Sequence, residues 1–174
     1  FSEHMFDVVT IPYPSTWDGD SDVEKREDEA LAFLNAQLEL YGSNISALIL
    51  EPLIQGASGM RVCRKEFLIK VIAMVRSYGV HVIFDEVMTG FGRTGSIFAF
   101  EQLGIIPDFL CLSKGITGGF LPLALTVTTN EIYDAFYSTK WEKAFAHGHS
   151  YTANPIACAA AIASWELLNS TTTT

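Results

Sequence analysis

A lysine, Lys114, follows a short apolar run at residues 109–112 in the stretch DFLCLSKGITGG, and glycine-rich sequence comes directly after it. The run predicts a buried strand, so we expect Lys114 at the tip of that strand, close to apolar surroundings. Partial desolvation lowers the pKa of an amine and makes it a nucleophile toward carbonyl groups. A lysine placed in this way can hold an aldehyde cofactor, such as pyridoxal phosphate, as a Schiff base.

Pyridoxal phosphate also needs an acid that keeps its ring nitrogen protonated and donors that bind its phosphate. Asp85 directly follows the apolar run VHVIF, residues 80–84, and can supply the acid. The stretch HGHSYTANP, residues 147–155, leads into a helix start and can supply hydroxyl and backbone N–H groups. His147 and His149 also form an H-x-H pattern, but no third ligand has suitable spacing, so we predict no metal site.

Two other motifs in this part of the chain suggest different functions. A hydrophobic strand that ends in Asp85-Glu86 is also typical of the magnesium-binding motif of a nucleotide-binding ATPase module. That reading needs a G-x-x-x-x-G-K-[ST] stretch, which this sequence lacks, although one in a longer chain would revive it. The stretch GFGRTG, residues 90–95, matches G-x-G-x-x-G, but the preceding acids would repel a pyrophosphate. We interpret it as a glycine-rich turn with Arg93 held in an ion pair.

The elements that must position these residues follow from periodicity and breakers. A capping box of Ser21 and Glu24 predicts the start of a helix that stops at Gly42, and residues 1–20 read as irregular. Asn154 and Pro155 predict the start of another helix. The remaining predicted elements are strands at 46–50, 80–84, 109–112 and 123–129, and helices at 65–79, near 96–103 and at 154–169.

Strands and helices alternate, and the strands are apolar on both faces. This pattern predicts an α/β fold, a three-layer αβα sandwich with a mostly parallel sheet. Ligands of such sheets bind at the carboxyl ends of the strands. Glu51, Asp85 and Lys114 come directly after, or one residue beyond, predicted strands, and we expect them at one edge of the sheet.

The composition narrows the class of protein. The chain has 174 residues, 49% of them hydrophobic, and a net charge of −9, which favours a globular domain and disfavours a nucleic-acid surface. No apolar run is long enough for a membrane span, no secretory signal is visible, and the three cysteines read as reduced core residues of a cytoplasmic protein. The opening FSEHMFDVV and the closing NSTTTT predict a segment of a longer protein.

Four ordered stretches, LILEPLIQGASGM, VIFDEVMTGFGRTG, PDFLCLSKGITGG and HGHSYTANPIACAAA, resemble class III aminotransferases, which use pyridoxal 5'-phosphate on the fold-type I scaffold. The resemblance runs from about residue 45 to 168. It implies that residues 1–174 form a partial cofactor-binding large domain, with the small domain and the N-terminal part of the large domain outside this chain. The stretches HGHSYTANP and QGASGMRVC are more similar to the branch of the family that acts in biotin synthesis.

The resemblance also implies roles for individual residues. Lys114 matches the lysine that forms the internal aldimine and later moves the proton, and Asp85 matches the partner of the pyridine nitrogen. Ser150 and the backbone at His149 match a phosphate-binding step that the family donates across a dimer interface. Gly148 matches a position against the substrate. A homodimer with a shared active site follows from these matches, and the small residues of the helix at 154–165 would allow two protomers to approach closely.

Glu51 and Arg93 match motif positions near the site. Met88 stands where many relatives carry glutamine, which disfavours ornithine- or aminobutyrate-type enzymes. The biotin branch implies amino transfer from S-adenosylmethionine to 7-keto-8-aminopelargonate. Lysine as the amino donor, an omega-amino acid:pyruvate type of aminotransferase, and a non-catalytic fragment remain alternatives.

Overall fold

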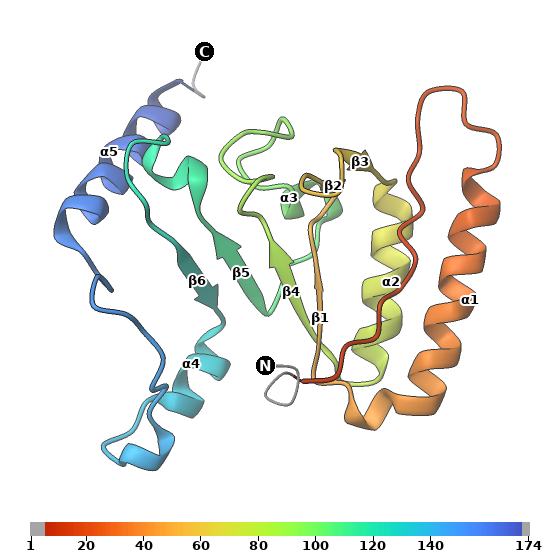
Figure 1. Cartoon of the computed structure of the whole chain (residues 1–174), viewed down its shortest axis with the longest axis horizontal. Coiled ribbons are helices and arrows are strands. Elements are labelled where there is room, and N and C mark those ends of the chain that lie inside the picture. Colours follow the sequence, from red (N-terminus) through yellow and green to blue (C-terminus); the bar gives the residue numbers. More distant parts are fainter. Residues whose placement is uncertain (1–5, 172–174) are drawn as a thin grey trace.

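A four-stranded mixed sheet forms the centre of the computed structural model, which describes residues 6–171 (Figure 1). Its strands are β1 (Ala47–Leu50), β4 (His81–Asp85), β5 (Phe109–Leu112) and β6 (Leu125–Thr128), in the order β1-β4-β5-β6. The first three strands are parallel, and β6 is antiparallel to β5. The predicted α/β class with a mostly parallel sheet is confirmed.

The register of β4 and β5 brings their carboxyl ends level. Ile83 lies opposite Phe109, and Asp85 lies opposite Cys111. Because β5 ends at Leu112, Lys114 follows it at the same edge of the sheet at which Asp85 ends β4. The sheet therefore places the predicted acid and the predicted amine on neighbouring strands.

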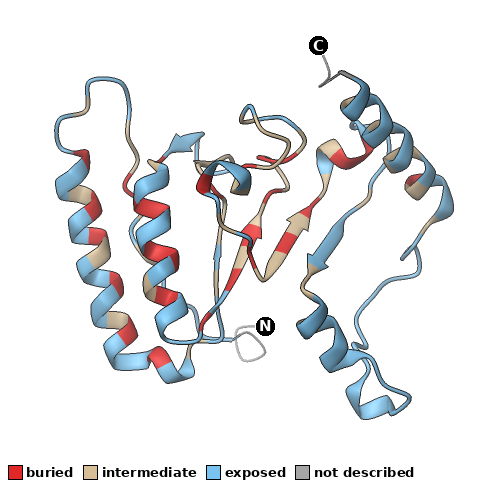
Figure 2. Ribbon diagram, turned by 180° about the vertical axis from the view of Figure 1, so that it is seen from behind, coloured by how far each residue is buried: buried red, intermediate tan, exposed pale blue. Residues whose placement is uncertain are grey.

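Two helices cover one face of the sheet. The inner helix α2 (Lys65–Ser77) turns a stripe with helical spacing toward β4, and the outer helix α1 (Val23–Tyr41) packs against α2. Figure 2 shows the buried residues gathered on α1, α2 and the centre of the sheet. Ile49, on the opposite face of β1, is exposed, so within the described residues that part of the face has no covering layer. The buried stripe of α2 consists of Phe67, Leu68, Val71, Ile72 and Val75.

The remaining elements are short, apart from the last helix. They are the 3-10 helices η2 (Gly42–Asn44), η3 (Lys114–Thr117) and η4 (Trp141–Lys143), the hairpin β2 (Ile54–Gln55) and β3 (Arg61–Val62), and the helices α3 (Phe100–Leu103), α4 (Asn130–Phe136) and α5 (Pro155–Thr171). The sequence did not predict the hairpin or α4. Asn154 caps α5 as predicted, since its Oδ1 accepts hydrogen bonds from the N–H groups of Ile156 and Ala157.

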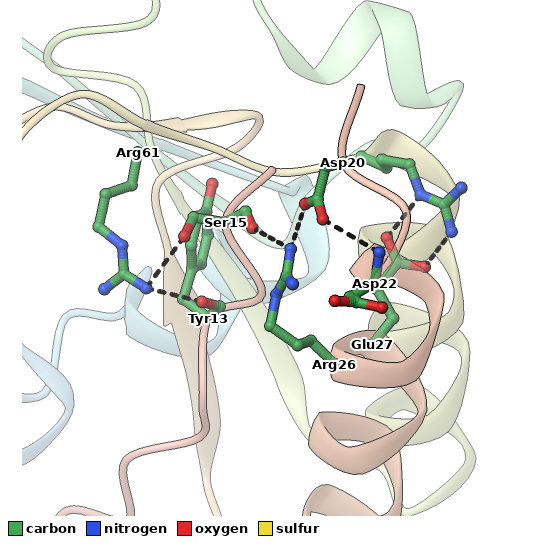
Figure 3. Close-up of polar contacts among 8 residues, drawn as sticks. Tyr13, Ser15, Asp20, Asp22, Arg26, Glu27 and Arg61 are labelled. Carbon is green, nitrogen blue, oxygen red and sulfur yellow. Dashed lines mark hydrogen bonds and ion pairs between the residues drawn. The ribbon is translucent and has the colours of Figure 1, made fainter. Parts of the chain in front are cut away.

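The predicted capping box at Ser21 is wrong. Helix α1 begins at Val23 with Asp22 in the N-cap position, and no side chain caps it. The N–H of Asp22 donates instead to Asp20, which also pairs with Arg26 (Figure 3). The local polar groups are therefore used to hold the preceding strap against α1.

This strap, residues 6–22, has no helix or strand, as predicted for this part of the chain. Arg26 donates to the backbone oxygen of Ser15, and Arg61 of β3 donates to the backbone oxygen of Tyr13 (Figure 3). These bonds tie the strap to α1 on one side and to the hairpin on the other. No helix in the described part of the chain is both long enough and apolar enough to cross a bilayer.

Candidate active site

Lys114 begins the turn that follows β5, and its backbone is in the left-handed region with φ of 43°. Non-glycine residues adopt this conformation rarely, and it occurs most often where the surroundings hold a functional residue in place. The Ser113 hydroxyl donates to the backbone oxygen of Leu123 at 2.7 Å, and the Thr117 hydroxyl donates to that of Leu121 at 2.6 Å. The turn around Lys114 is thus fastened on both sides.

The turn lies beside a hollow of about 890 Å³. Lys114, Phe91 and Arg93 line this hollow together with residues of α5 and of the loop that follows η3. Apolar residues such as Phe91 and Leu123 line this hollow, as expected from the sequence, but Lys114 is exposed, so the described residues do not provide the expected desolvation. Arg93 is also exposed and forms no ion pair with a described residue, so the predicted ion pair is wrong. Two cationic groups therefore border one open space, which suits an anionic ligand.

Asp85 ends β4 at the same edge. Its Oδ1 accepts a hydrogen bond from the N–H of Val87 at 3.0 Å, and the residue is half-buried. Burial and, after it, the charge of Asp85 raise the pKa of the Cys111 thiol on the neighbouring strand. The carboxylate of Asp85 therefore lies on the same face of the sheet as Cys111. Cys111 is three residues before Lys114 in the sequence.

Glu86 points away from that face and is fully buried. Its carboxylate accepts hydrogen bonds from the N–H groups of Ala99 and Phe100 and from the hydroxyl of Thr89. Burial raises its pKa. A carboxylate engaged in this way is not presented to a magnesium ion, which argues against the ATPase reading of the Asp85-Glu86 pair. The sequence resemblance implies no role for Glu86 within an aminotransferase site.

The stretch GFGRTG forms a turn, as predicted, and does not open a helix. Phe91 and Gly92 in it both have positive φ, of 60° and 88°. A Cβ atom on Gly115 would lie 3.0 Å from the Cβ of Phe91, so the loop packs directly on the backbone after Lys114. Only glycine at position 115 allows this approach without a shift.

Glu51 and Met88 lie on the β1 side of Asp85. The Oε2 of Glu51 accepts a hydrogen bond from the N–H of Gly56 at 2.9 Å. A Cβ atom on Gly56 would lie 2.9 Å from the Cε of Met88, so the loop of the β2–β3 hairpin rests on Met88. Glu51 therefore shapes this loop, and it does not line the hollow beside Lys114.

Gly148, His149 and Ser150 lie in an exposed segment before α5. The N–H of His149 donates to the hydroxyl of Thr152, and the Nδ1 of His149 accepts from the N–H of Tyr151. Helix α5 meets η3 at Ser164, which lies about 13 Å along the helix from its start, given a rise of about 1.5 Å per residue. The structure therefore does not bring these three residues to Lys114 within one chain.

Comparisons with known proteins give a consistent family. The family model described as aminotransferase class-III matches residues 1–173. An adenosylmethionine-8-amino-7-oxononanoate aminotransferase from Synechococcus elongatus is 54% identical over 97% of this chain, which covers 39% of that protein. The chain thus spans about two fifths of the length of this curated relative.

Solved structures agree with this assignment. The crystal structure of adenosylmethionine-8-amino-7-oxononanoate aminotransferase from Methanocaldococcus jannaschii is 39% identical with a TM-score of 0.75, and the match covers 83% of this chain and 34% of that one. An amine transaminase from an uncultivated Pseudomonas species, in its PLP-bound form, is 36% identical with a TM-score of 0.78, over 84% of this chain and 33% of that one. The family model and the similar relatives show the family, and the fold and the neighbouring Lys114 and Asp85 agree with it. The chain belongs to the class III aminotransferase family.

Proposed function

We propose that this chain supplies the cofactor-binding part of a pyridoxal-phosphate-dependent aminotransferase that moves an amino group from S-adenosylmethionine to 7-keto-8-aminopelargonate in biotin synthesis. The observation that carries the proposal is the placement of Asp85 and Lys114 at the level ends of neighbouring strands. The name of the Synechococcus elongatus relative supports the choice of reaction.

The two side chains fit the cofactor by their chemistry. Pyridoxal phosphate supplies an electron sink that stabilises negative charge at the carbon next to the transferred nitrogen. The amine of Lys114 would hold the aldehyde carbon of the cofactor, and once the substrate amine has displaced it there, the freed amine could carry the proton between the two carbons that exchange it. The carboxylate of Asp85 would hold the proton on the ring nitrogen, because a negative charge beside that nitrogen favours the protonated ring.

Arg93 lines the hollow with Lys114 and is the described cation best placed for a substrate carboxylate. A guanidinium binds a carboxylate through two parallel hydrogen bonds and so fixes its direction as well as its place. The glycine-rich turn that carries Arg93 leaves its side chain exposed toward this space. We therefore assign substrate contact to Arg93, in addition to Gly148, which the resemblance places against the substrate.

The phosphate site is expected from a second copy of the chain. Ser150 and the backbone at His149 are exposed and remote from Lys114 in their own chain, as a group donated across an interface would be. Large apolar side chains near them, Trp141, Phe145 and Tyr151, are also exposed. These features support a homodimer with shared active sites. The three free cysteines fit the reducing cytoplasm as the place of action.

The proposal is tested by mixing the chain with pyridoxal phosphate, recording the visible absorbance, reducing with borohydride, and mapping the modified peptide. We expect a yellow band that reduction fixes onto Lys114. The variant Lys114→Ala should show neither band nor fixation, whereas Lys140→Ala, which removes an exposed lysine before η4, should behave as the wild type. Fixation spread over several surface lysines, and unchanged in Lys114→Ala, would refute the assignment.

The choice of substrates needs a separate assay. Once cofactor binding at Lys114 is established, 7-keto-8-aminopelargonate is offered with S-adenosylmethionine, with lysine, or with an omega-amino acid as donor. We expect amino transfer with S-adenosylmethionine. Transfer from lysine alone would keep the acceptor and replace the donor, and transfer from omega-amino acids to pyruvate would assign the chain to the other type of class III enzyme.

A further inference from the structure

Glu86 is a buried acid to which the proposed function gives no part. It is fully buried, and none of the ion pairs among the described residues includes it. Its carboxylate accepts from the N–H groups of Ala99 at 2.6 Å and Phe100 at 2.8 Å, and from the Thr89 hydroxyl at 3.3 Å. Burial raises its pKa, so the charged form is held at a cost in free energy. These three hydrogen bonds are the compensation that the fold gives it.

The same residue fastens both ends of the loop 87–99. Its backbone oxygen accepts from the N–H of Gly90 at 3.0 Å, near the start of the loop, and its carboxylate accepts from Ala99 and Phe100 at the end. Its own N–H donates to the backbone oxygen of Cys111 in β5 at 3.0 Å. One residue thus joins β4, β5 and the two ends of the loop.

The loop needs such fastening. Phe91 and Gly92 have positive φ, and a non-glycine residue in this region is retained only where its surroundings over-determine it. Phe91 packs on the backbone at Gly115, and Phe91 and Arg93 line the hollow beside Lys114. In Figure 1 this loop lies between β4 and α3 at the carboxyl edge of the sheet. A small displacement of the loop would therefore move two walls of the hollow.

We propose that Glu86 is a positioning residue of this site: by binding the backbone at both ends of the loop 87–99, it sets the place of Phe91 and Arg93 against the turn of Lys114. The proposal rests on the proposed function, because it assumes that Lys114 holds the cofactor. Glu86 itself touches neither cofactor nor substrate in this scheme.

The test compares the wild-type chain with Glu86→Gln, which keeps the shape of the side chain but leaves one acceptor oxygen for two N–H groups. Hydrogen exchange is measured at the amides of Ala99 and Phe100 and, for global stability, at Ile72 in α2. We expect about tenfold faster exchange at Ala99 and Phe100, the ratio that loss of one ordinary hydrogen bond produces, and no change at Ile72. The matched control Glu29→Gln removes an exposed acid of α1 and should change neither.

A second measurement connects the loop to the site. The rate at which borohydride fixes pyridoxal phosphate onto Lys114 should fall several-fold in Glu86→Gln and stay at the wild-type value in Glu29→Gln. Unchanged exchange at Ala99 and Phe100, an equal rise at Ile72, or local loosening without a slower fixation would each overturn the proposal. A wild-type chain that fixes no cofactor at Lys114 overturns the proposed function instead, and the exchange data then still measure the loop anchor separately.

Thr89→Val serves if Glu86→Gln does not fold. It preserves the volume of a buried side chain and removes one of the three donors to the carboxylate. In Thr89→Val, a rise in the exchange rate at Ala99 and Phe100 that is smaller than the rise expected for Glu86→Gln, together with slower fixation of pyridoxal phosphate at Lys114, supports the proposal. Wild-type values for both measurements overturn it.

Discussion

At the scale of single residues, the site depends on an acid and an amine that the chain separates but the sheet brings level. Asp85 ends β4, and Lys114 follows β5, its parallel neighbour. This placement could be predicted from sequence, because an apolar run followed by a polar residue marks the carboxyl end of a buried strand. The exposure of Lys114 could not be predicted, since it depends on which segments cover the hollow and not on the residues adjacent in sequence.

Asp85→Asn tests the role of the charge at the ring nitrogen. Asparagine keeps an oxygen that can accept from the N–H of Val87, so the fold should be preserved, but it removes the negative charge. We expect cofactor fixation at Lys114 to persist and amino transfer from the donor to slow about 100-fold or more. Single-turnover absorbance measures the transfer. Asp134→Asn, an exposed acid on α4, should leave both unchanged, and a wild-type transfer rate in Asp85→Asn would contradict the assigned role.

At the scale of elements, the long periodic segments were predictable and the short ones were not. Helix α2 and its buried stripe follow from the helical spacing of its apolar residues, and Asn154 with Pro155 marked the start of α5. The β2 and β3 strands have two residues each, too few to show a period, and their loop is held by Glu51. Helix α4 has seven residues, and its cap, Thr129, is the last residue of the run 123–129, whose composition predicts a strand.

The failed capping box at Ser21 has the same kind of cause. Ser21 and Glu24 have the right types and spacing, but the neighbouring Asp20 is taken by Arg26 and by the N–H of Asp22. Contacts between the strap and α1 therefore decide where the helix begins. Such contacts join residues whose pairing no local pattern reveals, which is why tertiary structure overrode the motif.

The packing of α1 on α2 predicts a specific loss of stability. Glu27 of α1 is buried, with 3% of its side chain exposed, and both its oxygens accept from Arg64, which is 34% exposed. Arg64→Met should lower the free energy of unfolding by about 2 kcal/mol, because it leaves a buried carboxylate unpaired, while the exposure of Arg64 limits the effect. Urea unfolding followed by circular dichroism gives the value.

The chain offers a matched control for this pair. Glu24 lies 3.5 Å from the same Arg64 but is 80% exposed, so Glu24→Gln should change the free energy of unfolding by less than about 0.5 kcal/mol. The double variant Glu27→Met with Arg64→Met should recover most of the loss, since it removes the unpaired charge. Equal losses for Arg64→Met and Glu24→Gln would show that burial of Glu27 does not set the cost.

At the scale of the whole molecule, buried residues are unevenly distributed along the chain. The buried residues lie mainly on α1, α2 and the sheet, while α4 and α5 are largely exposed (Figure 2). Several large apolar side chains on and around α4 and α5 are exposed, and large exposed apolar surface is typical of an interaction site. Among them are Phe120, Tyr137, Trp141, Tyr151 and Ile156. Because the predicted phosphate-binding residues lie in the same region, one interface would both cover this surface and complete the site.

Self-association of the chain should therefore depend on the start of α5. Ile156, in the first turn of α5, is 70% exposed, and Ile156→Glu places a charge on the proposed interface at a helix N-terminus, where an acid favours the helix itself. Sedimentation velocity should show the wild type as a dimer and the variant with at least about tenfold weaker association. Ile106→Glu adds the same charge at a side chain that is 74% exposed in the loop before β5, and it should dimerise like the wild type. A monomeric wild type, or equal weakening by both substitutions, would exclude this surface as the interface, and Ser150 would then have no route to a partner's Lys114 through it.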